Sequence, residues 1–107
     1  MDTQQLLNDM WSAARQVAGN KVKDLRGYLD KEIAAIAKGA TAIEVDFVSG
    51  RILKSQAKRA WADLADSTKD VQLVVKMTLL ATAQDAVNAA LAVAAKALSS
   101  AVGFALV

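Results

Sequence analysis

Side chains that could carry out chemistry are sparse in this chain of 107 residues. It contains no histidine and no cysteine, so it lacks the commonest general base, the commonest metal ligand and any thiolate. Its serines have no histidine partner, and none lies in a Gly-x-Ser-x-Gly turn. A di-metal helical site would need Glu-x-x-His pairs. We therefore expect no catalytic residues, no cofactor and no metal site, and we interpret the carboxylates as helix caps and solvated faces.

One short run of basic residues is the best candidate for contact with a charged partner. Arg51, Lys54, Lys58 and Arg59 follow a predicted turn, and the first three share a face at helical spacing. They could contact a polyanion or an acidic protein surface. Two carboxylates across the turn would weaken their field, and the net charge is only +2. Nucleic acid is therefore a disfavoured partner, and a solvated hairpin tip is the alternative interpretation.

The elements that must position these residues are predicted to be helices. The composition is 54% hydrophobic and 22% charged, with no proline, which excludes a disordered chain and favours helix nearly throughout. Apolar or small residues recur every three or four positions from Leu7 to Phe47, and again from Ala57 to Phe104. Gly50 lies between the two runs and can adopt the left-handed conformation that ends a helix.

We predict an all-α chain that forms a long antiparallel helical hairpin turning near Gly50. The expected parts of this single all-helical domain, 1–107, are an arm at 3–48, a turn at 49–53 and an arm at 54–104. The alternative is a compact four-helix bundle. Its breaks would lie near 19–20, 49–53 and 67–70.

The second arm ends in an apolar stretch, Val71–Val107, which on a helix shows three faces. Large apolar side chains form one stripe, which we predict to be an oligomer interface: Leu73, Met77, Leu80, Val87, Leu91, Leu98, Val102 and Leu106. A thin polar line runs from Asp85 to Lys96, and the far side is mostly alanine. One hairpin arm can cover only one of these faces, so we expect homo-oligomerisation into a helical bundle to cover the rest.

A lipid bilayer, rather than other subunits, could instead bury this apolar stretch. Ala86–Val107 has the length of a membrane span, but it contains Asn88 and Lys96. A central lysine costs about 2.5–3.5 kcal/mol on insertion scales. The alternative function is thus a small membrane-active protein that forms pores or penetrates a bilayer.

Two segments carry a family resemblance. Val48–Arg59 is similar to a Gly-x-Ile-(Ser)-x-x-(Gln/Glu)-Ala turn that leads into a helix, with Leu53 where the pattern has serine. Leu79–Leu91, together with the ending Gly103–Val107, resembles the tail of small helical proteins encoded by tailed phages and prophages. That group has no assigned activity, and the resemblance implies a component of a virion or a phage-tail-like particle.

The sequence therefore predicts a non-enzymatic structural or assembly protein. Its expected partners are further copies of itself and other particle proteins, with a membrane as the alternative partner. A regulatory helical binding module is a further alternative. The segment Met1–Gln5 is acidic and polar rather than basic and apolar, so we expect no signal peptide. We expect synthesis in the cytoplasm and incorporation into a virion or tail-like particle.

Overall fold

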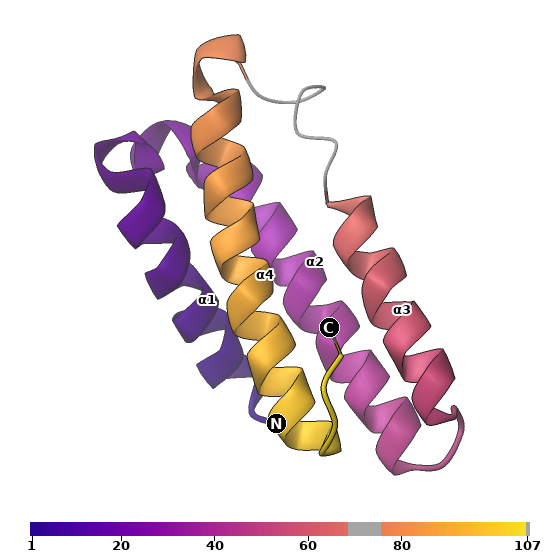
Figure 1. Ribbon diagram of the computed structural model, residues 1–107. Helices are drawn as coiled ribbons and strands as arrows, with labels where there is room; N and C mark the ends of the chain where they lie inside the picture. Colours follow the sequence, from indigo (N-terminus) through magenta and orange to yellow (C-terminus); the bar gives the residue numbers. More distant parts are fainter. Residues whose placement is uncertain (69–75, 107) are drawn as a thin grey trace.

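A computed structural model describes residues 1–68 and 76–106, and these residues form four α-helices that run up, down, up and down (Figure 1). In chain order, the elements are α1 (Thr3–Ala18), the 3₁₀ turn η1 (Gly19–Lys21), α2 (Val22–Val48), α3 (Lys54–Ser67), the 3₁₀ turn η3 (Met77–Leu79) and α4 (Leu80–Val102). The all-α class predicted from the sequence is confirmed.

Local hydrogen bonds explain where two of the helices begin. The carboxylate of Asp2 accepts from the backbone N–H groups of Gln4 and Gln5 at 3.0 and 3.3 Å, and so caps α1. At the start of α3, Leu53 has no side-chain acceptor, but its own N–H donates to Gln56 Oε1 at 2.7 Å. A capping box consists of two hydrogen bonds, and this bond from the N-cap backbone to the Gln56 side chain is one of them. A helix therefore begins here although leucine stands in place of the expected serine.

The predicted turn at Gly50 is confirmed, but the first arm is not one continuous helix. Gly50 has φ 80°, a conformation that glycine adopts without steric cost. Gly19 has φ 58° and ψ −130°, which ends α1 and lets η1 redirect the chain. The apolar period continues through Gly19 because α1 and α2 each bury their own face, so an unbroken period did not require an unbroken helix.

The second arm is not continuous either. α3 ends at Ser67, and the buried Thr68 hydroxyl donates to the Ala65 carbonyl at 2.8 Å. α4 then runs back beside α2 in the opposite direction to α3 (Figure 1). The third predicted break, 67–70, falls partly outside the described residues. The compact four-helix bundle, with the chain reversing at Gly19–Lys21 and at Gly50, replaces the two-arm hairpin.

The core lies between α1, α2 and α4, while α3 packs on α2. α1 packs against α4, and both helices bury alanines, whose small side chains allow helices to approach closely. The buried alanines of these two helices are Ala14 and Ala18 on α1 and Ala83, Ala86, Ala90 and Ala94 on α4. Larger side chains of α2, including Leu29, Ile33 and Ile36, are fully buried and complete the core.

The thin polar line predicted on the last helix is confirmed as its solvent face. Asp85, Asn88 and Lys96 are all exposed, while the large apolar side chains of α4 turn inward. α4 therefore has faces covered by α1 and α2 and one exposed polar face.

Two helical glycines of α2 provide a matched test of this packing. A Cβ added at Gly27 would meet no atom within 4 Å, whereas one at Gly39 would lie 2.7 Å from Leu64 Cδ2. Gly27→Ala should raise the free energy of unfolding by about 0.5–1 kcal/mol, because glycine is a poor helix former. Gly39→Ala should gain no stability, because Leu64 must move. Urea denaturation followed by circular dichroism measures both, and equal gains would contradict the close α2–α3 contact.

Candidate functional site

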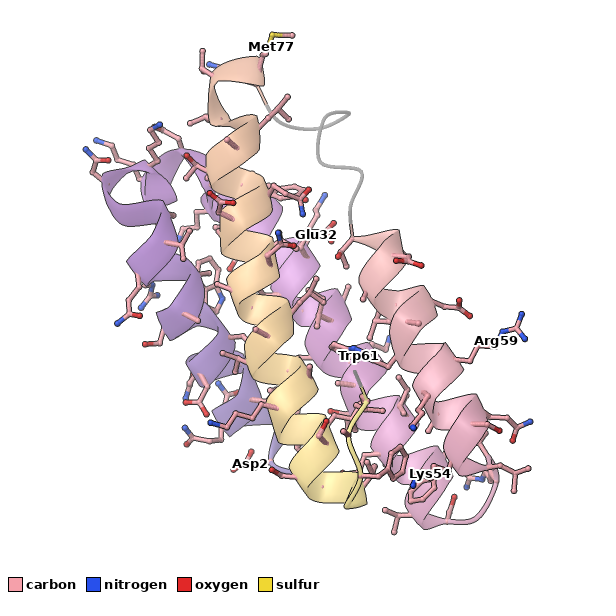
Figure 2. All side chains as sticks on the ribbon, in the orientation of Figure 1. Asp2, Glu32, Lys54, Arg59, Trp61 and Met77 are labelled. Carbon is pink, nitrogen blue, oxygen red and sulfur yellow. The ribbon has the colours of Figure 1, made fainter. Side chains whose placement is uncertain are left out.

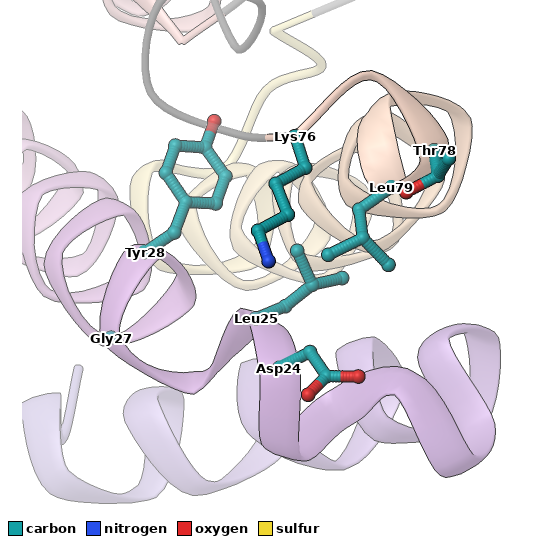
Figure 3. A pocket seen from close by; sticks show the side chains of 7 residues that line it. All are labelled: Asp24, Leu25, Gly27, Tyr28, Lys76, Thr78 and Leu79. Atoms are coloured by element: carbon teal, nitrogen blue, oxygen red, sulfur yellow. The ribbon is translucent and has the colours of Figure 1, made fainter.

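A hollow lined by Tyr28 lies at the end of the bundle where α2 and α4 begin. It encloses about 490 Å³, and a second hollow of about 340 Å³ shares Tyr28 and Gly27 with it. The lining residues of the larger hollow are Asp24, Leu25, Gly27, Tyr28, Lys76, Thr78 and Leu79. Figure 3 shows the Lys76 side chain running between Tyr28 and Leu79, with its ammonium toward Leu25 and Asp24.

The polar groups of this hollow could bind a small molecule, but they lack the pairing of a nucleophile with a general base that catalysis needs. Burial raises the pKa of Tyr28 to about 12, and the carboxylate of Glu32 adds to this shift. Burial also raises the pKa of Glu32. The phenol is protonated near neutral pH and could donate a hydrogen bond to a bound molecule. One ammonium, one carboxylate and two hydroxyls line the larger hollow and could hold a small polar molecule, but they provide no activated nucleophile.

The titration of Tyr28 gives a direct test of its surroundings, because it is the only tyrosine in the chain. Absorbance near 295 nm should show a midpoint near pH 12, and Glu32→Gln should lower that midpoint. The folded pKa lies above the unfolded value near 10. The contribution of Tyr28 to stability is thus complete below pH 10 and is lost as the pH rises from about 10 to about 12. A midpoint near 10 would contradict the placement.

The four basic residues predicted to contact a charged partner differ in what they contact within the chain. Arg51 pairs with Asp46 at 3.0 Å. Lys54 and Lys58 place their ammonium groups 5.0 and 5.9 Å from the centroid of the Phe104 ring. Figure 2 shows Arg59 pointing away from the bundle. Three of the four cations therefore have a partner within the chain, which weakens their case as a polyanion site.

Phe104 was not singled out by sequence reasoning as a partner of these lysines. After α4, the chain folds back toward α2 and α3, and Phe104 meets Phe47 edge-on at 5.1 Å between ring centroids. Leu106 is buried, and its N–H donates to Ser99 Oγ at 3.3 Å. The contacts of Phe104 with Phe47, Lys54 and Lys58 join residues far apart in the chain, so no local pattern could have revealed them.

The stripe predicted to be an oligomer interface lies largely inside the molecule. Leu73 lies outside the described residues. The buried members are Val87, Leu91, Leu98 and Leu106. Leu80 and Val102 are half-buried, while Met77 is 86% exposed. The expectation that only one face of α4 could be covered is corrected, because the break at Gly19 returns α1 against α4 while α2 covers another side.

Comparison of the chain with protein-family models, curated proteins and solved structures finds no match in any of the three. Within the described residues, no group of three or more acidic side chains could hold a metal ion. Every buried side-chain nitrogen or oxygen in this part of the chain has a hydrogen-bond partner. The segment Met77–Val102 is long and apolar enough to cross a membrane, by length and composition alone.

Proposed function

We propose that this chain is a non-enzymatic structural protein that assembles with copies of itself. The observation that carries the proposal is the placement of its exposed large apolar side chains. Among the described residues, all of them lie in or beyond the terminal turns of helices, at the two ends of the bundle. Met1, Val45, Val48 and Leu53 lie at one end, and Val17 and Met77 lie at the other. An elongated bundle whose exposed apolar groups gather at its ends is suited to end-to-end association.

The residues around Tyr28 also support the proposal of a non-enzymatic protein. The hollow has an aromatic wall and several polar groups, but it has no nucleophile beside a base. The resemblance of the second half of the chain to phage-encoded helical proteins gives the proposed assembly a setting, a virion or tail-like particle. Other particle proteins are then its further partners.

Sedimentation velocity of the purified protein tests self-assembly. The weight-average sedimentation coefficient should rise with protein concentration in the micromolar range. A sedimentation coefficient that stays at the monomer value throughout this range would overturn the proposed function. Circular dichroism on the same samples verifies that the helices are intact.

A membrane-active protein is the second candidate, and the composition of Met77–Val102 favours it. To enter a bilayer, α4 would have to leave α1 and α2, and its Asp85–Lys96 line would then face a lumen or another polar surface. Flotation with anionic and neutral liposomes tests this candidate. Protein that stays at the bottom of the gradient with both compositions argues against it, whereas Leu91→Lys should abolish any flotation that α4 causes.

A further inference from the structure

The chain that follows α4 folds back on the bundle and packs against it. Gly103 has φ 84°, and this left-handed conformation ends α4 and turns residues 103–106 back along the bundle (Figure 1). Phe104 then meets Phe47 edge-on, with 5.1 Å between the ring centroids, and Leu106 is buried. We call residues 103–106 the C-terminal strap.

The C-terminal strap reaches α3 through two lysines. The ammonium groups of Lys54 and Lys58 lie 5.0 and 5.9 Å from the centroid of the Phe104 ring, within the range of cation–π attraction. Both lysines are exposed, and among residues 1–68 and 76–106 neither of them pairs with a carboxylate. The Phe104 ring is therefore the partner of both charges in the described part of the chain.

The position of Lys54 is unfavourable for its own helix. Lys54 is the first residue of α3 (Figure 2), at the helix end where the dipole is positive and a cation is disfavoured. Glutamine has nearly the same helix propensity as lysine, so helix formation alone gives no reason for a cation here. The electron-rich face of the Phe104 ring offers the compensating attraction.

α3 is the most lightly held of the four described helices. It buries only Ala57 and Trp61, fewer residues than any of the other three helices. It packs mainly on α2, whereas α1, α2 and α4 all pack on one another. A helix with few buried contacts opens at a lower free energy than the rest of the core, so a contact that fastens its first turn has a large effect on this opening.

We propose that the C-terminal strap is a latch that holds α3 closed on α2, and that this latch depends on the positive charges of Lys54 and Lys58. When these charges are neutralised, the Phe104 ring loses its attraction for α3, and α3 opens without the other three helices. Opening exposes Trp61 and the side of α2 on which α3 packs. The latch acts within a single chain, so this inference goes beyond the proposed self-assembly and does not depend on it.

Native-state hydrogen exchange, read by mass spectrometry, tests the dependence on charge. The double variant Lys54→Gln, Lys58→Gln should raise the exchange rate of the α3 amides about five-fold, because two cation–π contacts are lost, and it should leave α1 and α4 unchanged. The double variant Lys54→Arg, Lys58→Arg keeps both charges and should exchange like the natural chain. The helix dipole alone predicts the opposite sign for glutamine, because removing a cation from the start of a helix stabilises that helix. Exchange of α3 that is unchanged or slower in the glutamine variant overturns the latch.

Phe104→Leu tests the ring, because leucine keeps an apolar side chain but has no aromatic face. It should also accelerate exchange in α3, and combining it with the glutamine variant should add little, since both changes remove the same contact. Trp11→Leu is the matched control: Arg15 lies 5.3 Å over the Trp11 ring on α1, and losing this contact should leave α3 exchange unchanged. Fully additive effects, or an acceleration by Phe104→Leu that is equal in all four helices, overturn the latch.

Discussion

Replacing Trp61 with alanine should lower the free energy of unfolding by about 3–5 kcal/mol, the range for deleting a buried aromatic side chain. α3 packs on α2 and buries only Ala57 and Trp61 fully. Trp61 is 3% exposed, so its loss removes most of the large apolar surface that fastens this helix. Domains of this kind have only about 5–15 kcal/mol in total, and the variant should therefore be marginally stable.

Urea denaturation followed by circular dichroism measures this loss, and native-state hydrogen exchange locates it. Exchange should accelerate most in α3, because the other three helices keep their mutual contacts. Trp11→Ala is the control: Trp11 is only half-buried, and Arg15 lies 5.3 Å over its ring near the surface. A Trp61→Ala protein as stable as the Trp11→Ala protein would contradict the packing of α3.

Replacing Leu98 with alanine should cost about 2–5 kcal/mol, because Leu98 is fully buried and the surrounding core can relax only partly into the cavity. Met77→Ala is the matched partner from the same predicted stripe. It removes a side chain that is 86% exposed, so it should change the free energy of unfolding of the monomer little.

The two variants separate core packing from association. Thermal or urea unfolding at low protein concentration reports the stability of the single chain, and sedimentation reports its assembly. Leu98→Ala should reduce stability, whereas Met77→Ala should reduce only association. If the two variants were equally stable, Leu98 would not be buried within one chain, and the α4 stripe would again be interpreted as an interface between subunits.

Several features of this protein were determined by local sequence. The helical class follows from the absence of proline and the three-to-four-residue apolar period. The reversal at Gly50 needed only one glycine between two periodic runs, and the Asp85–Lys96 line marked the wet face of α4 because charged side chains stay in water. The scarcity of catalytic side chains is also a property of composition alone.

The tertiary structure decided which faces are covered and by what. A helical period persists whether a helix continues or folds back, so the period alone could not show that Gly19 returns α1 against α4. That return buries Val87, Leu91 and Leu98 inside one chain instead of between subunits. Likewise, the Lys54 ammonium lies over the Phe104 ring, and these two residues are far apart in the sequence. The sequence determined that α4 requires burial, and only the packing of the other helices decided that its own chain provides most of it.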